Sequence, residues 1–217
     1  MSEADPAALM RFVLDMREAG VTDLKTLSAL ERTDRAHFAP EHLRALALED
    51  VALPLAHGQS MSKPSVVGRM ISALDPKPGD LVLEVGTGSG FQAAALAAMA
   101  RKVTTLDRHR DLVADARARF GALRLMNVQA HLADGRAGWA EGAPYDRIIV
   151  NGAVDSVPAV LIDQLAEEGV IVAPVIEDGR ARLKRFEKKE GALGSGMTLG
   201  PIEVAALEEG VAEDQQP

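Results

Sequence analysis

Apolar positions in the first quarter of the chain recur at helical spacing. Leu9, Phe12, Val13 and Met16 lie on one helical face, and Gly20 follows as a helix C-cap. The pattern predicts helices over residues 5–50, then a loop at 51–65, where two prolines and a glycine break the periodicity. A helix at 66–74 ends at a Pro- and Gly-rich turn.

From residue 80 onward, short apolar runs alternate with helical segments. Strands are predicted at 81–85, 103–106, 128–132, 145–150 and 170–175, with helices at 91–100, 111–120 and 158–166. The run Ile148, Ile149, Val150 is typical of a strand buried on both faces. This alternation predicts a parallel sheet with right-handed crossovers and helices on both faces.

The alternation stops after residue 176. Residues 177–179 are a turn signal, and the flanking segments 170–176 and 181–187 are predicted to pair as an antiparallel hairpin. We expect a loop at 191–200, one more strand at 202–207 and a disordered tail at 208–217.

Composition narrows the class of protein. Lys and Arg number 24 against 32 Asp and Glu, and this net charge of −8 argues against a nucleic-acid binder that neutralises phosphates. The absence of cysteine excludes disulfides, thiolate zinc sites and Cys nucleophiles, and the five histidines show no metal-ligand spacing. The chain shows no signal peptide and no apolar run of membrane-spanning length, which favours a cytoplasmic protein.

The strongest chemical signal is LVLEVGTGSGFQAA at 81–94, a strand, a turn with three glycines and a helix. It departs from the dinucleotide fingerprint because Phe91 stands where a third small residue belongs, and it lacks the Lys-Ser/Thr of a Walker A loop. Glu84, at the strand end, would repel a pyrophosphate but suits a cationic ligand. S-adenosylmethionine carries a sulfonium and an ammonium and no phosphate. The alternative is a glycine turn without a ligand.

Two further acids follow neighbouring strands. Asp107 is placed to accept both hydroxyls of a ribose, and Asp134, before Gly135, can face an adenine amino group. Each has a plainer interpretation, as a helix N-cap for Asp107 and an Asp-Gly turn for Asp134. Open α/β sheets bind ligands at the edge where such strand ends meet.

Together these elements resemble the class I S-adenosylmethionine-dependent methyltransferases. The stretches 53–70, 75–97 and 134–175, with 12–40 upstream, closely resemble the protein-L-isoaspartate O-methyltransferase family, and the loop GQSMSKP at 58–64 is the part specific to that family. The resemblance implies S-adenosylmethionine as cofactor. It also implies methyl transfer to the α-carboxylate of L-isoaspartyl residues in damaged proteins, whose ester then collapses to a succinimide.

The resemblance also assigns site residues. It places the cofactor at Glu84, Gly86, Thr87, Gly88, Ser89, Gly90, Asp107, Arg108, Asp134 and Gly135. It places Ser62 beside the transferred methyl as the catalytic residue, with Gln59 and Ser60 in the same substrate loop. A carboxylate acceptor is already ionised at neutral pH, so no general base is needed and orientation by a hydroxyl suffices. The plainer interpretation of Ser62 is a cap for the helix that starts after Pro64.

The predicted fold is α/β, a Rossmann-like, doubly wound, mostly parallel seven-stranded methyltransferase sheet. An N-terminal helical extension and the substrate loop occupy residues 1–65. The S-adenosylmethionine-binding domain occupies 66–207 and includes the C-terminal antiparallel hairpin, and the tail occupies 208–217.

Some positions depart from the pattern of the family that the chain resembles. These departures predict that the chain is a divergent member of that family. They are His57, the run Lys63-Pro64-Ser65 and Glu203, which stands where the family has an arginine. Two alternatives follow: a methyltransferase for another acceptor, such as a tRNA base or a small molecule, and a degenerate cofactor-binding module. The basic cluster at 180–185 is interpreted as a solvated hairpin face, or else as a contact for RNA or acidic protein. We expect isoaspartyl proteins as substrates, no membrane or nucleic-acid partner, no metal, and a monomer, with a dimer as the alternative.

Overall fold

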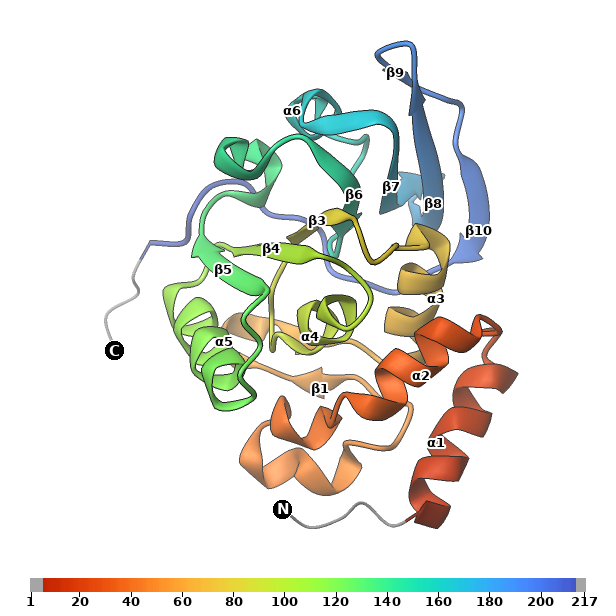
Figure 1. Cartoon of the computed structure of the whole chain (residues 1–217), viewed down its shortest axis with the longest axis vertical. Coiled ribbons are helices and arrows are strands. Elements are labelled where there is room, and N and C mark those ends of the chain that lie inside the picture. The colour runs from red at the N-terminus through yellow and green to blue at the C-terminus, as the bar shows by residue number, and fades with distance from the viewer. Residues whose placement is uncertain (1–5, 214–217) are drawn as a thin grey trace.

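The computed structural model describes residues 6–213, which fold around one mixed sheet. Its strands run in the order β10-β8-β7-β6-β3-β4-β5 (Figure 1), with the short β9 paired to β8. Five strands are parallel: β3 (Leu81–Val85), β4 (Lys102–Asp107), β5 (Val128–Leu132), β6 (Tyr145–Val150) and β7 (Leu165–Glu177). The predicted parallel strands and their order of appearance are therefore confirmed.

The predicted C-terminal hairpin is also present. β8 (Arg180–Lys189) runs antiparallel to β7 from Val170↔Glu187 to Glu177↔Arg180, around the turn at Asp178 and Gly179. β10 (Met197–Pro201) runs antiparallel to β8, and β9 (Ala192–Leu193) extends it. These strands form the antiparallel end of the sheet.

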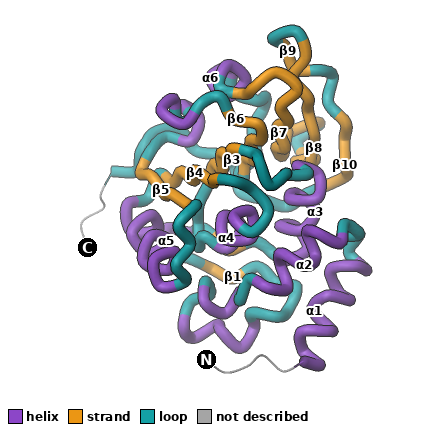
Figure 2. Tube along the Cα trace, viewed as in Figure 1, coloured by secondary structure: helices purple, strands orange, loops and turns teal. Residues whose placement is uncertain are grey.

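Apolar side chains alternate between the two faces of the sheet, as a pleated strand requires. Val82 belongs to a large cluster that contains α3 (Pro64–Leu74), α4 (Phe91–Ala97) and part of α5 (Arg110–Ala122). Leu83 and Val85 belong to a second cluster with α6 (Ala159–Asp163), beside the short turns η4 (Gly135–Ala137) and η5 (Ala140–Gly142). Helical segments therefore cover both faces, which confirms the doubly wound fold (Figure 2).

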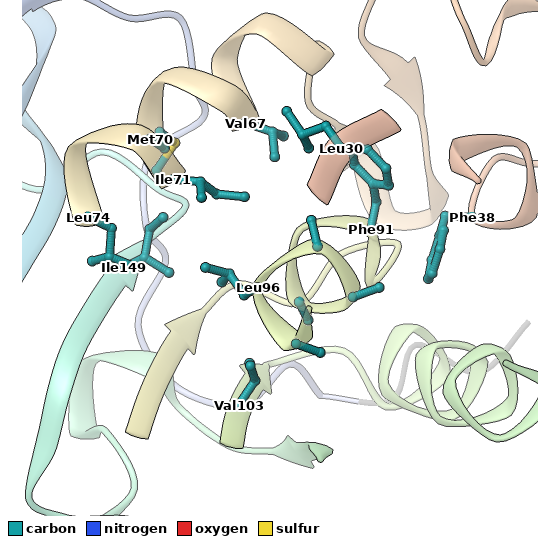
Figure 3. Close-up of a cluster of buried hydrophobic side chains, with 14 of the residues drawn as sticks. Leu30, Phe38, Val67, Met70, Ile71, Leu74, Phe91, Leu96, Val103 and Ile149 are labelled. Carbon is teal, nitrogen blue, oxygen red and sulfur yellow. The ribbon is translucent and has the colours of Figure 1, made fainter. Parts of the chain in front are cut away.

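The N-terminal extension packs into the first of these clusters. It consists of α1 (Pro6–Glu18), α2 (Leu24–Arg32), η1 (Arg35–His37) and η2 (Glu41–Leu46). Figure 3 shows Leu30 and Phe38 of the extension beside Val67 and Phe91 of the core helices. A Cβ on Gly68 would lie 2.8 Å from Val21, so α3 approaches the extension closely. One continuous apolar core thus joins the extension to the sheet.

The loop expected at 51–65 contains a small antiparallel hairpin. β1 (Leu53–Pro54) pairs with β2 (Ser60–Met61) across η3 (Ala56–Gly58), with the Leu55 amide donating to the Gln59 carbonyl. This hairpin presents residues 59–62 to the carboxyl edge of the parallel strands.

Three sequence predictions are wrong in the C-terminal half. Residues 191–200 are not a loop throughout, because they contain β9 and most of β10. Residues 202–207 do not form the last strand, since only Ala206 makes an isolated bridge, to Ala153. The helix predicted at 158–166 is shorter, because it ends at Asp163 and β7 begins at Leu165. Helical and strand-like apolar spacing are hard to separate in such short runs.

The expected disordered tail also differs from the structure over residues 208–213. The Ala212 amide donates to the Arg108 carbonyl, and the Arg108 guanidinium pairs with Glu208 and donates to the Gly210 carbonyl. Residues 214–217, which complete the predicted tail, lie outside the described residues.

Candidate active site

The glycine turn between β3 and α4 is folded tightly against β4. Gly86, Gly88 and Gly90 have φ values of 94°, 51° and 88°, in the left-handed region that favours glycine. The amides of Gly86 and Thr87 both donate to the Leu106 carbonyl. A Cβ on Gly90 would lie 2.9 Å from the Phe120 ring, so Gly90 is required by both backbone and space.

Glu84 lies behind this turn and is fully buried. One carboxyl oxygen accepts from the Thr105 hydroxyl, which in turn contacts the Thr87 hydroxyl at 2.7 Å; the other accepts from Asn151 Nδ2 at 3.1 Å. Burial raises the pKa of Glu84 to about 8, against the opposing effect of the Thr105 and Asn151 hydrogen bonds. A cation bound nearby would favour the ionised form.

Asp107 is oriented by two backbone amides. Its Oδ2 accepts from the Gly88 amide at 2.8 Å and its Oδ1 from the His109 amide at 3.0 Å. Asp107 is not the N-cap of α5, because His109 holds that position and no side chain caps the helix, so the N-cap interpretation is wrong. The Asp107 side chain instead lines two cavities at the strand ends.

Asp134, unlike Asp107, caps a short helical turn and does not line a cavity. Its Oδ1 accepts from the Arg136 amide at 2.9 Å, which makes it the N-cap of η4. It lines none of the cavities at the sheet edge, whereas its neighbour Gly135 lines one. A Cβ on Gly135 would lie 2.3 Å from Val85, so the backbone there approaches the end of β3 closely.

Three adjoining cavities follow the carboxyl edge of the parallel strands, and we number them first to third. The first lies between the strand ends and the segment after β10, and the second lies between the glycine turn and β2. The third, of about 830 Å³, lies between the start of α3 and the same C-terminal segment. Gln59 and Asn151 line all three, so the cavities form one groove.

The predicted substrate-loop residues lie where these cavities meet. Gln59 lines all three, and both Ser60 and Ser62 line the second and third. Ser62 does not cap α3: the N-cap is Lys63, with no side-chain cap bond, and Asp50 accepts from the Ser65 amide at 2.8 Å instead. The capping interpretation of Ser62 is therefore wrong.

The predicted cofactor residues gather around the first and second cavities. Gly86, Asp107, Arg108 and Gly135 line the first, and Gly86, Thr87, Gly88, Ser89 and Asp107 line the second. Glu84 and Gly90 lie behind the turn rather than in the lining.

Asn151 is the main site residue that sequence reasoning missed. Its Nδ2 donates to Glu84 and to the Gly86 carbonyl, and its Oδ1 accepts from Gln92 at 2.8 Å. Both amide hydrogens are used inside the protein, so Asn151 can offer a ligand only an acceptor. It directly follows β6, and the strand-end rule that found Asp107 would also have found it.

His57 and His109 form a pair of stacked rings beside the first cavity. Their rings stack with centroids 4.3 Å apart, and His57 Nε2 lies 2.7 Å from Asp111 Oδ2. His109 lines the first cavity. The pair joins the β1–β2 hairpin to the start of α5, a contact between distant segments that no local motif predicts.

Charged side chains line the third cavity. They are Asp50, Lys63, Arg69 and Glu203. Arg69 donates to the carbonyls of Leu199 and Pro201 and so holds the end of β10. Lys63 makes no ion pair with any residue in 6–213.

Other predicted features lie away from the groove. In the basic cluster, Arg182 and Lys184 pair with Glu177, and Arg185 donates to the Ala73 carbonyl. Trp139 stacks on His131 with ring centroids 4.2 Å apart. Residues 6–213 hold no group of three or more His, Asp or Glu placed for a metal. No helix in that range is both long and apolar enough to cross a membrane.

Known proteins resemble this chain in both sequence and fold. The family model of protein-L-isoaspartate(D-aspartate) O-methyltransferase matches residues 8–203. The protein-L-isoaspartate O-methyltransferase of Azorhizobium caulinodans is 45% identical over 212 residues, 97% of each chain. That of Ruegeria pomeroyi is 43% identical over 215 residues, 99% of this chain and 100% of the relative. The predicted divergence is wrong, because this identity extends over nearly the whole length.

Solved structures agree on the fold. A Plasmodium falciparum beta-aspartate methyltransferase in complex with S-adenosyl-L-homocysteine has a TM-score of 0.78 at 23% identity, covering 91% of this chain and 97% of the other. A second protein-L-isoaspartate O-methyltransferase structure has a TM-score of 0.82 at 24% identity, covering 94% of this chain and 67% of the other. Both therefore share the arrangement of sheet, extension and helices.

Proposed function

We propose that this chain, which belongs to the protein-L-isoaspartate(D-aspartate) O-methyltransferase family, methylates the α-carboxylate of L-isoaspartyl residues in damaged proteins. The observation that carries the proposal is the position of Ser62, which lines both the second cavity, beside the glycine turn, and the larger third cavity. A group at that junction can touch a bound cofactor and an acceptor at once.

The residues of the first and second cavities fit S-adenosylmethionine. When bound, this cofactor supplies a methyl group on a positively charged sulfur. The glycine turn allows close approach of the backbone, the Asp107 carboxylate can accept ribose hydroxyls, and the Asn151 oxygen suits a cationic group. We assign the cofactor to the residues predicted from the sequence and add Asn151 and His109. Asp134 acts by holding Gly135 in the lining.

The third cavity fits a peptide carboxylate. Its volume of about 830 Å³ lies in the ordinary range for ligand sites. A terminal-type carboxyl titrates near ~3.5, so the acceptor is ionised without a general base. We assign Ser62 to orient it by hydrogen bonding, with Gln59 and Ser60 beside it, while Lys63 supplies positive charge. The groove is open to solvent along one side, so the bound cofactor and peptide themselves must exclude water from the reacting oxygen.

Methyl transfer to a matched pair of peptides tests this function. The peptides are identical except that one contains an isoaspartyl and the other an aspartyl residue, and the donor is radiolabelled S-adenosylmethionine. We expect base-labile label on the isoaspartyl peptide only, and a slower rate with Ser62→Ala.

Two other results would redirect the assignment. Label on neither peptide, with cofactor binding intact by calorimetry, would contradict the acceptor and favour a methyltransferase for a tRNA base or small molecule. Absence of cofactor binding would instead favour a degenerate binding module.

The remaining parts of the proposal concern the state of the protein. We propose a monomer, because residues of a single chain line all three cavities, and we propose the cytoplasm as its compartment. Sedimentation velocity tests the first, and a dimer at micromolar concentration would contradict it. Cell fractionation tests the second.

A further inference from the structure

Arg35 is a buried cation, and the acid Asp50 favours its charged form but makes no ion pair with it. Its side chain is 1% exposed, and no ion pair joins it to an acid within residues 6–213. Its guanidinium donates instead to five backbone carbonyls. Burial lowers its pKa to about 10, so the group keeps its charge and all its donors at neutral pH.

Three of the five carbonyls come from the segment before the substrate loop, and the other two come from the start and the end of the loop. Nη1 donates to Leu46, Ala47 and Glu49, with the shortest bond, 2.9 Å, to Ala47. Nη2 donates to the carbonyls of Val51, at 2.8 Å, and Ser62, at 3.1 Å. The loop therefore leaves the guanidinium at Val51, passes through the β1–β2 hairpin and returns to it at Ser62.

Among residues 6–213, no side chain other than that of Arg35 makes a hydrogen bond to Ser62. Its hydroxyl makes no hydrogen bond to another residue of the described chain, and it is not the cap of α3. Its position therefore depends on its own main chain, whose carbonyl Arg35 binds. The same guanidinium lies 5.9 Å from the ring centroid of Phe91, the residue that begins α4 after the glycine turn.

We propose that Arg35 is the positioning residue that fixes Ser62 at the junction of the second and third cavities. This inference rests on the proposed function, because it assumes that Ser62 orients the acceptor carboxylate. Arg35 lines none of the three cavities and so acts only through the loop. A lysine cannot replace it, because a single ammonium lacks the planar fork that reaches carbonyls on two sides.

The first test compares Arg35→Lys with Met16→Ala. Met16 is a buried residue of α1 in the same extension and lines none of the three cavities. We expect Arg35→Lys to lower kcat/KM for the isoaspartyl peptide about 10- to 100-fold, as misplacement of a catalytic group does. The Kd for S-adenosylhomocysteine should stay within about twofold, since that cavity is built by the glycine turn. Met16→Ala should lower Tm with little change in kcat/KM.

A double-mutant cycle with Ser62→Ala separates positioning from stability. If Arg35 acts through Ser62, Arg35→Lys costs far less in the Ser62→Ala background than in the wild type. Equal losses in both backgrounds, or a lowered Tm with unchanged kcat/KM per folded molecule, would overturn the proposal. If Arg35→Lys fails to fold, Arg35→Gln is taken through the same cycle, because its amide keeps part of the donor set.

Failure of the proposed methylation of isoaspartyl residues can be distinguished from failure of the role proposed for Arg35. If the wild-type protein labels neither peptide, the acceptor assignment falls. If the wild type labels the isoaspartyl peptide but the cycle is additive, only the role of Arg35 falls.

Discussion

Glu84 is the residue whose setting departs furthest from ordinary solution chemistry. It is a carboxyl group with no access to water, held by a hydroxyl and an amide and facing the acid Asp107. The sequence marks it as an acid at a strand end, but only the fold shows that it lies beneath the turn rather than in the cavity. Its protonation is therefore coupled to folding.

The stability of the ligand-free protein should fall as pH rises through neutrality. The pKa of Glu84 is about 8 when folded and 4.5 ordinarily, so between these values the folded state holds a proton that unfolding releases. Its contribution is full below pH 4.5 and is lost toward pH 8, at up to about 1.4 kcal/mol per pH unit. Urea unfolding at pH 5.5 and 7.5 measures this, and Glu84→Gln should flatten the difference. An equal slope in both proteins would contradict it.

Gly90→Ala should destabilise the turn. The substitution puts a side chain at φ 88° and a Cβ 2.9 Å from Phe120, for a cost of about 1–3 kcal/mol. Gly79→Ala is the matched control, since Gly79 has no positive φ and open space around it. Thermal unfolding should show a lower Tm for Gly90→Ala and almost no change in Tm for Gly79→Ala. Equal Tm values would show that the turn accommodates a side chain.

At the scale of elements, β10 builds one wall of the third cavity. Arg69 on α3 donates to the carbonyls of Leu199 and Pro201, and the residues just after β10 line the cavity. The helix α3 thus follows directly on the end of the substrate loop, and through Arg69 it also holds the wall that the C-terminal segment gives to the third cavity.

Arg69→Ala should therefore raise KM for the isoaspartyl peptide. If the loosened wall weakens peptide binding by the net worth of one hydrogen bond, about 1 kcal/mol, KM rises about 5-fold. The Kd for S-adenosylhomocysteine should not change. Arg180→Ala, an exposed arginine at the start of β8, is the control. An unchanged peptide KM in steady-state kinetics would show that β10 holds its place without Arg69.

The elements that pattern alone predicts correctly are those with long or doubly buried apolar runs. Ile148 and Ile149 in β6 are fully buried, as their unbroken run indicates. The pattern fails at β1, β2 and β10, where pairing depends on partners distant in the chain, such as Lys184 opposite Thr198. Asp107 was found because it follows a strand, whereas Arg35 could not be, because its acceptors are carbonyls set by tertiary structure.

At the scale of the whole molecule, the groove depends on both ends of the chain. The β1–β2 hairpin supplies residues 59–62, and the segment after β10 supplies residues 202–208 (Figure 1). That segment crosses the sheet edge, held by the Ala153 amide on the Ala205 carbonyl and by the Leu207 amide on the Ala153 carbonyl. It then reaches Arg108 at the start of α5.

Removal of residues 208–217 should speed cofactor release. The deletion removes the partners of Arg108, namely Glu208, Gly210 and Ala212, and opens one side of the first cavity. We expect the dissociation rate of S-adenosylhomocysteine, measured by chase in stopped flow, to rise about 5- to 10-fold. A deletion of residues 214–217 alone keeps every described contact and serves as the control. Equal rates for both deletions would contradict a role for this segment.

Because the walls of the groove come from opposite ends of the chain, the order of synthesis matters. A ribosome-bound chain can fold its parallel strands and its glycine turn once β7 has emerged. The first and third cavities both lack a wall until the residues after β10 have also emerged. The nascent chain therefore completes neither its cofactor cavity nor its peptide cavity before residues 202–208 are in place, and methylation is deferred until translation of this region is complete.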